Sequence, residues 1–121
     1  MKIGDRIIFP GFISDRDLDT VYRNAALYVF PSLSEGFGLP SLEAMARGVP
    51  VVSSNATCLP EILGDAAAYF NPLDIDDMAK VIKKALSDEN WRKTLIQKGF
   101  EQIEKYSWQK MAKETLKIYS K

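Results

Sequence analysis

The sequence predicts an α/β fold in which a parallel sheet is flanked by helices and the last third of the chain is helical. Three observations support this prediction. Strand-like segments alternate with helical segments over the first two thirds, as in a parallel sheet with right-handed crossovers. Residues 27–30, Leu-Tyr-Val-Phe, are apolar throughout, which is typical of a strand buried on both faces. From residue 75 onward, apolar residues recur at helical spacing.

The first two thirds of the chain contain short strands and short helices. The first strand, Arg-Ile-Ile-Phe, is ended by Pro10-Gly11. The helix that follows has Ser14 or Asp15 as its expected N-cap. A later helix has Pro40 in its first turn and Gly48 just past its end. The predicted strands are 6–9, 27–30, 49–52 and 67–70, and the predicted helices are 16–25, 40–47 and a single turn at 60–63.

Helices make up the predicted C-terminal third. The first carries an apolar stripe from Ile75 to Leu86, with an acidic first turn and lysines near its end, as the helix dipole favours. The second covers 89–105 and contains Gly99, which we expect to weaken it. The last begins after Ser107 as its N-cap. Trp91 and Trp108 lie at helical spacing with aliphatic residues, so both are expected in the core.

The composition of the chain argues against several classes of function. A chain of 121 residues fits one domain, 1–121. Its 16 basic and 16 acidic residues cancel, which argues against non-specific nucleic-acid binding. Histidine is absent, which excludes Ser-His-Asp and Cys-His catalysis and removes the commonest metal ligand, so no metal is expected. Cys58 has no partner for an internal disulfide and is expected to be an inert loop residue in a reducing compartment.

A location in the cytoplasm is expected. No apolar run approaches the roughly 18 residues of a membrane span. Lys2, Asp5 and Arg6 place charges at the start of the chain, which does not resemble a signal peptide.

Residues 31–43, Pro-Ser-Leu-Ser-Glu-Gly-Phe-Gly-Leu-Pro-Ser-Leu-Glu, contain the candidate site. Glu35 and Glu43 are separated by seven residues, with the loop Gly36-Phe37-Gly38 and then Pro40 between them. Glycines allow close approach of the backbone to a ligand, and a helix start offers N–H groups to phosphate oxygens. The two carboxylates accept hydrogen bonds from sugar hydroxyls. This combination describes a site for an anionic, hydroxyl-rich ligand such as a nucleotide-sugar.

The position of this segment favours the same interpretation. In parallel sheets, ligands bind beyond the carboxyl ends of strands, near a topological switch point, and this loop follows the strand 27–30. The simpler alternatives are two solvated surface carboxylates and an ordinary strand-to-helix turn. Neither accounts for the glycines, the helix start and the two glutamates occurring together.

The chain resembles the C-terminal, donor-binding domain of the group 1 retaining glycosyltransferases of the GT-B fold, which carry an E-x7-E motif. The resemblance implies a Rossmann-like sheet that forms the C-terminal half of that fold. It rests on the motif with its Gly-Phe-Gly-Leu-Pro filling and on landmarks in family order along almost the whole chain. These landmarks are Gly11-Phe12-Ile13-Ser14, Leu18 to Ala25, Phe30-Pro31-Ser32, Ala44 to Val52, Leu59-Pro60-Glu61-Ile62, Gly64 to Ala67 and Tyr106-Ser107-Trp108 leading to Tyr119.

The resemblance implies a role for each matching residue. Glu35 matches the glutamate that faces the donor sugar and the reacting centre, and Glu43 the one that binds the ribose hydroxyls. The loop between them matches backbone that contacts sugar hydroxyls and the diphosphate, and the helix start matches one that faces the phosphates. Gly11 to Ser14 match the loop that lines the nucleobase pocket. The implied donor-binding residues are Gly36, Phe37, Gly38, Leu39, Ser41, Leu42 and Glu43, with Gly11, Phe12, Ile13 and Ser14 around the nucleobase.

The resemblance also implies the reaction. A sugar passes from a nucleoside-diphosphate sugar to an acceptor glycan or glycolipid with retention of configuration, by front-face attack and without a metal or cofactor. Glu35 would orient and stabilise the reacting sugar. The acceptor domain and an arginine–lysine pair for the diphosphate match nothing here, so this chain is expected to be most of a donor-binding domain and inactive alone. Its last helix would then expose apolar residues that favour self-association.

Several alternatives stay open. GDP-mannose is favoured over UDP-sugars as the expected donor, because the segments Leu59-Pro60-Glu61 and Gly64 to Ala67 resemble the matching segments of many mannosyltransferases. The chain could instead be a non-catalytic nucleotide-binding or scaffold module of the same fold, or part of an epimerase or a phosphorylase-like relative. The acceptor would lie on the missing domain, at the cytoplasmic face of a membrane in the full-length protein.

Overall fold

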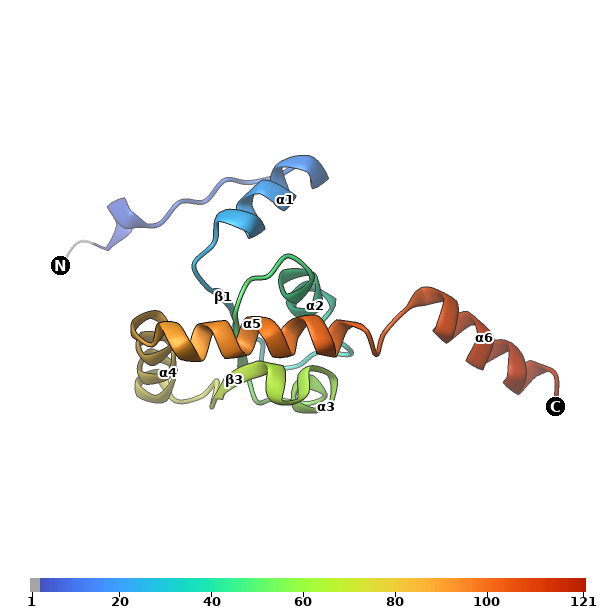
Figure 1. The fold of residues 1–121 in the computed structure, drawn as a ribbon. Coiled ribbons are helices and arrows are strands. Elements are labelled where there is room, and N and C mark those ends of the chain that lie inside the picture. The colour runs from blue at the N-terminus through green and yellow to red at the C-terminus, as the bar shows by residue number, and fades with distance from the viewer. Residues whose placement is uncertain (1–2) are drawn as a thin grey trace.

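The computed structural model describes residues 3–121, and it confirms an α/β fold with a parallel sheet and a helical C-terminal third (Figure 1). In this part of the chain the sheet has three strands in the order β1-β2-β3, all parallel. Val51 of β2 is aligned with Tyr28 of β1 and Ala67 of β3. The strands are β1 (Tyr28–Phe30), β2 (Val51–Ser54) and β3 (Ala67–Phe70).

The helices follow the predicted order closely. Four of them begin at a side-chain cap: the Ser14, Asp74, Asp88 and Ser107 side chains each accept a hydrogen bond from the backbone N–H three residues later. The predicted caps Ser14 and Ser107 are therefore confirmed. The helices are α1 (Asp15–Asn24), α2 (Leu39–Ala46), α3 (Leu59–Leu63), α4 (Ile75–Ser87), α5 (Glu89–Ile103) and α6 (Trp108–Tyr119), with 3-10 turns η1 (Gly4–Arg6) and η2 (Gly64–Ala66).

The core lies on both faces of the sheet. Successive residues of a strand point to opposite faces, and β2 is buried at all four positions. Val51 packs in one cluster with residues of α2 and α3, while Val52 packs in the other with residues of α4 and α5. The first cluster includes Met45, Leu59 and Leu63; the second includes Phe70, Ala85 and Leu95. Trp91, predicted in the core, is half-buried and packs against the second cluster.

The predicted strand at 6–9 is wrong. Residues 4–6 form η1, and residues 7–10 belong to no strand, helix or turn. Ile8 and Phe9 are 85% and 88% exposed. An apolar run becomes a strand only where a neighbouring strand satisfies its backbone, and the three described strands pair only with one another. Figure 1 shows this segment running outside the sheet, over the side on which α1 lies.

The position of β1 in the sheet corrects two further expectations. β1 is half-buried at each residue and not buried on both faces, because it forms an edge of the described sheet. The strand order follows the chain order, so the described sheet contains no topological switch point. The third strand begins at Val51 and not at residue 49. Pro50 lacks an N–H for a ladder, and its carbonyl accepts from Tyr28 N at 3.0 Å.

Three predictions for the C-terminal third are also wrong. Trp108 is 71% exposed, because α6 projects from the end of α5 away from the sheet (Figure 1). Gly99 is not a weak point but a packing site, since a Cβ there would lie 3.2 Å from Met45 Cγ. Its absence of a side chain lets α5 approach α2 closely. Ile75 is also exposed, although it lies on the predicted apolar stripe.

The expected exposed apolar residues are present on α6, whereas self-association stays a prediction. They are Trp108, Met111, Leu116, Ile118 and Tyr119. Across residues 3–121, none of the helices is both long enough and apolar enough to pass through a membrane.

Two leucines test this account of the core. Leu63 in α3 is fully buried, whereas Leu73 before α4 is 81% exposed. We expect Leu63→Ala to lower the free energy of unfolding by about 2–5 kcal/mol, since it removes buried methyl groups and leaves a cavity. Leu73→Ala should change it by less than about 0.5 kcal/mol. Urea denaturation of both variants measures the difference, and equal losses would contradict the assigned core.

Candidate functional site

The loop between β1 and α2 ends in a glycine that the fold requires. Gly38 is the N-cap of α2, with φ 90° and ψ 41°, in the left-handed region. A Cβ at this position would lie 2.7 Å from Leu59 Cδ2 at the start of α3. Gly36 has nothing within 4 Å of the same hypothetical atom, so its space is open. Gly38 therefore sets both the start of α2 and its close contact with α3.

The first turn of α2 contains a buried hydroxyl without a partner. Pro40 lies in this turn, as predicted, and Ser41 N–H donates to Gly38 O at 3.1 Å. Ser41 and Leu42 are buried, and Ser41 Oγ has no hydrogen-bond partner. Leaving a buried hydroxyl unpaired costs about 1–3 kcal/mol, so most such groups in proteins are paired. The free hydroxyl lies in the turn that the sequence assigned to a ligand.

Glu35 is held by hydrogen bonds from two loops. Its side-chain Oε1 accepts from Ser32 Oγ at 2.9 Å, within its own loop. Its backbone N–H donates to Thr57 Oγ1 at 3.1 Å, and the Thr57 hydroxyl donates to the Glu35 carbonyl, also at 3.1 Å. The Cys58 thiol donates to the same carbonyl at 3.3 Å. Residues beyond the carboxyl end of β2 thus hold the backbone of a residue beyond the carboxyl end of β1.

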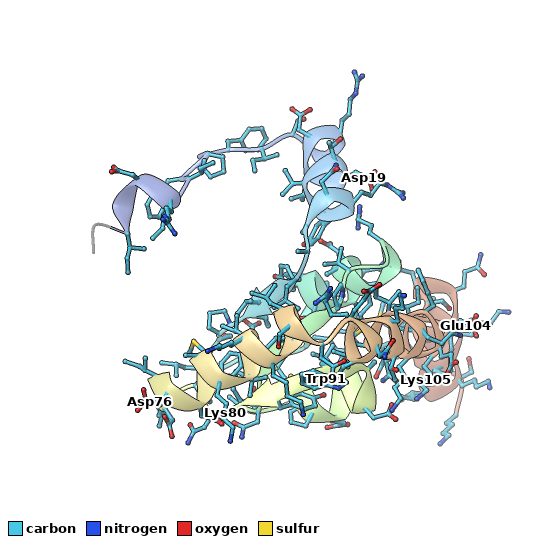
Figure 2. The ribbon with its side chains drawn as sticks, turned by 60° about the vertical axis from the view of Figure 1, so that its left-hand side comes forward. Asp19, Asp76, Lys80, Trp91, Glu104 and Lys105 are labelled. Carbon is cyan, nitrogen blue, oxygen red and sulfur yellow. The ribbon has the colours of Figure 1, made fainter. Side chains whose placement is uncertain are left out.

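Glu43 is exposed and is linked to α1. Its Oε2 accepts from Tyr22 OH at 3.4 Å, a long hydrogen bond. Arg47, one turn later on α2, places its guanidinium 5.0 Å from the centre of the Tyr22 ring. Arg47 Nε also bonds Asp19 Oδ1 on α1 at 2.7 Å (Asp19 is labelled in Figure 2). This cluster of Asp19, Tyr22, Glu43 and Arg47 joins α1 to α2.

The charges of both glutamates act on Tyr28, a residue of β1. Burial, and next the negative charges of Tyr22, Glu43 and Glu35, together raise the pKa of Tyr28 to about 12. The pKa of Tyr22 is raised by burial and by Glu43. Both carboxylates therefore lie near enough to the Tyr28 phenol for their charges to act on it.

A groove of about 560 Å³ lies beside Glu43, between α2 and the segment that leads into α6. Phe37 and Tyr106 meet in it edge to face, with ring centres 5.5 Å apart. Its lining is largely apolar and also includes charged side chains such as Lys105. The Phe37 side chain of the glycine loop therefore packs toward this groove.

The residues assigned to the nucleobase lie at the start of α1. Gly11 has φ 69°, Phe12 is exposed, and Ile13 is half-buried. Ser14 bonds within its own helix: its Oγ accepts from Asp17 N and donates to Asp17 Oδ2. Ser14 precedes Tyr22 by eight residues, roughly 12 Å along a helix. The described contact between α1 and the glutamates is made by Tyr22, not by residues 11–14.

Sequence reasoning missed five residues of this arrangement. Arg47 follows Glu43, and Arg23 follows Asp19, at the four-residue spacing of helical neighbours, which was a usable signal. Nothing in the sequence indicated that Asp19 and Tyr22 face α2, or that Thr57 bonds a residue 22 positions earlier. Such contacts depend on how the elements pack.

Comparison with known proteins places the chain in a family. Residues 1–102 match the family described as "Glycosyl transferases group 1". The chain is 42% identical over 113 residues to "O-antigen chain mannosyltransferase B" of Escherichia coli. This match covers 93% of this chain and 30% of that protein. The chain spans less than one third of the length of the curated relatives that it matches.

Solved structures of related proteins share the fold. A sucrose-phosphate synthase from Thermosynechococcus elongatus superposes with a TM-score of 0.86 at 32% identity, covering 98% of this chain and 30% of that one. The C-terminal domain of a glycosyl transferase group 1 family protein from Francisella tularensis superposes with a TM-score of 0.73, also at 32% identity. That match covers 85% of this chain and 54% of the other. The predicted fold class, a Rossmann-like half of a GT-B fold, is confirmed.

The two loop glycines give a matched test of the geometry. We expect Gly38→Ala to lower the free energy of unfolding by more than about 1 kcal/mol, because its φ disfavours a side chain and Leu59 occupies the space. Gly36→Ala should be close to neutral, since its surroundings are open. Denaturation curves for both variants test this, and a tolerated Gly38→Ala would show that α2 begins differently.

The link between α1 and α2 predicts a pH effect. Hydrogen bonds from Arg23, and next from Arg47, lower the pKa of Asp19 below its ordinary value of 3.8. A carboxylate with a lowered folded-state pKa stabilises the fold above its unfolded-state pKa, and the stabilisation is lost as the pH falls through the folded-state pKa. Asp19→Asn should therefore lower stability at neutral pH and differ progressively less from the parent below pH 3.8. A difference independent of pH would contradict this role.

Proposed function

The chain belongs to the group 1 glycosyl transferases, and from this we propose that it supplies the sugar-donor site of a retaining hexosyltransferase. The full-length enzyme would move a sugar from a nucleoside-diphosphate sugar to an acceptor and retain the configuration of the anomeric carbon. One observation carries the proposal: Glu35 and Glu43 flank a glycine loop that opens a helix, and the charges of both act on Tyr28 of β1.

The start of α2 suits the diphosphate. A helix N-terminus carries roughly half a positive charge, which stabilises the negative charge that develops on a departing diphosphate. The open surroundings of Gly36 leave room for a ligand to approach the loop backbone. We assign contact with the diphosphate to the loop from Gly36 to Leu39, together with Ser41 and Leu42.

The two glutamates suit hydroxyl groups. An ionised carboxylate has about four acceptor positions. Glu43 is exposed and accepts one long bond from Tyr22, so it retains acceptor positions for the two hydroxyls of a ribose. Glu35 accepts from Ser32 through Oε1, which leaves Oε2 for a hydroxyl of the transferred sugar. We propose that Glu35 orients this sugar and stabilises positive charge at its reacting carbon.

In the proposed reaction the leaving phosphate helps to remove the acceptor proton as the acceptor attacks from the same face. No protein nucleophile is required, so Glu35 and Glu43 are not a hydrolase pair flanking the bond. Neither a metal nor a cofactor is required, since α2 and basic residues outside this chain would offset the phosphate charge.

The transferred sugar is proposed to be mannose, with GDP-mannose as donor ahead of UDP-sugars. The name of the Escherichia coli relative, a mannosyltransferase of O-antigen chains, supports the sugar and suggests a polysaccharide acceptor. The structural similarity to a sucrose-phosphate synthase leaves a hexose other than mannose as the alternative transferred sugar. The acceptor would bind a further domain of the full-length protein, in the cytoplasm or at its membrane face, so this chain alone would not turn over.

Calorimetric titration of the full-length protein with GDP, UDP and ADP tests the donor site. We expect one nucleotide to bind, and Glu43→Gln to weaken that binding by about 10-fold or more, because a hydroxyl pair loses a charged acceptor. Glu61→Gln, on the neighbouring α3, is the control for a nearby lost charge. Unchanged affinity in Glu43→Gln would remove Glu43 from the donor site.

Turnover tests the role of Glu35. In the full-length enzyme, Glu35→Gln should lower kcat by about 100-fold or more while the fold is kept, since it removes charge that stabilises the transition state. Sugar transfer is measured by release of the nucleoside diphosphate, and folding by the unfolding midpoint. Nucleotide binding without transfer in the parent protein would favour the non-catalytic binding module instead.

A further inference from the structure

Thr57 makes reciprocal hydrogen bonds to the backbone of the proposed reaction-centre glutamate. Its hydroxyl accepts from Glu35 N–H and donates to Glu35 C=O, both at 3.1 Å. A threonine hydroxyl has one donor and two acceptor positions, so one side chain satisfies both backbone groups at once. We infer that Thr57 is a positioning residue for Glu35, an inference that rests on the proposed function.

The backbone of Thr57 is in an unfavourable conformation. With φ 50°, it is the non-glycine residue of positive φ within the described chain. The left-handed region disfavours β-branched side chains in particular, and glycine would adopt it without strain. Strained residues of this kind persist where the surrounding structure compensates, and they cluster at functional sites. Here the compensation is the pair of bonds to Glu35, which glycine could not make.

The turn that carries Thr57 is itself well anchored. It connects β2 to α3, and Ala56 N–H donates to the buried Ser54 Oγ at 3.0 Å. Cys58 adds a third bond to Glu35 through its thiol, at 3.3 Å. Leu59, which follows, is fully buried and occupies the space that Gly38 leaves open. Contacts of its own therefore hold this turn in place, in addition to the two bonds from Thr57 to Glu35.

Loss of the Thr57 hydroxyl should affect the chemical step and not the binding of the nucleotide. It acts on the Glu35 backbone, not on the nucleotide, whose affinity we assign to Glu43 and the start of α2. Small misplacements of a catalytic group slow the chemical step strongly. An interaction that matters in the transition state and not in the ground state changes kcat and leaves KM alone. Loss of the Thr57 hydroxyl should thus lower kcat with little effect on the donor KM.

Four variants of the full-length enzyme test this inference. Thr57→Val keeps the shape but removes the hydroxyl, Thr57→Gly removes both the hydroxyl and the strain, and Thr57→Ser keeps the hydroxyl. Thr94→Val is the matched control, because the Thr94 hydroxyl donates to Asn90 O on α5 and touches no residue of the site. For each we would measure kcat, the donor KM and the unfolding midpoint.

We expect kcat to fall by about 10-fold or more in Thr57→Val and Thr57→Gly, with the donor KM within about twofold of the parent. Thr57→Gly should be at least as stable as Thr57→Val, because it relieves the positive φ. Thr57→Ser should restore kcat to within about threefold, and Thr94→Val should not change it. A purely structural role predicts instead that kcat follows the unfolding midpoint.

Glu35→Gln in the same assay separates the two proposals. If Glu35→Gln turns over like the parent, the proposed function of the site is wrong. If Glu35→Gln is inactive while Thr57→Gly and Thr57→Val keep the parent kcat, the site stands and the inference about Thr57 is overturned. A loss carried by the donor KM alone in the Thr57 variants would also overturn it.

Discussion

The contact between Gly38 and Leu59 is the constraint on which the rest of the site depends. Gly38 has a left-handed backbone, and the space that its Cβ would fill holds the Leu59 side chain. The start of α2 is thereby set against the start of α3, and each helix follows the carboxyl end of a neighbouring parallel strand. Because α2 begins here, Ser41 is buried, Glu43 lies one turn further along, and the helix N-terminus lies beyond the carboxyl end of β1.

Much of the fold and the local parts of the site could be predicted from the sequence. Four helices begin at side-chain caps, and α2 is marked by Pro40 and Gly48, so the positions of these helices followed from local chemistry. Residues 6–9 have an equally good local pattern, but a strand also needs a partner, which no local pattern reveals. The prediction that Trp108 lies in the core was wrong for the same reason, since helical periodicity indicates an apolar face without showing what covers it.

The parts of the site that could not be predicted join distant segments. Thr57 and Glu35 are 22 residues apart, and Asp19 and Arg47 are 28 apart. Such pairs become neighbours only when the parallel strands bring the loops after β1 and β2 together and α1 packs beside α2. A single sequence specifies these contacts through the whole fold, so no spacing rule identifies them. Gly99 was misjudged likewise, because its cost in an isolated helix is offset by the approach of α5 to Met45.

The two glutamates differ in how firmly they are held, and this difference fits the proposed roles. The Glu35 backbone has three hydrogen bonds from the turn at 57–58, and its carboxylate a fourth from Ser32. Glu43 is exposed and accepts one long bond from Tyr22. A group that acts on a reacting carbon gains from a fixed position, since small displacements cost rate. A group that binds ribose tolerates adjustment, since its hydrogen bonds re-form over a range of geometries. The structure thus assigns rigidity to the glutamate for which we propose the chemistry.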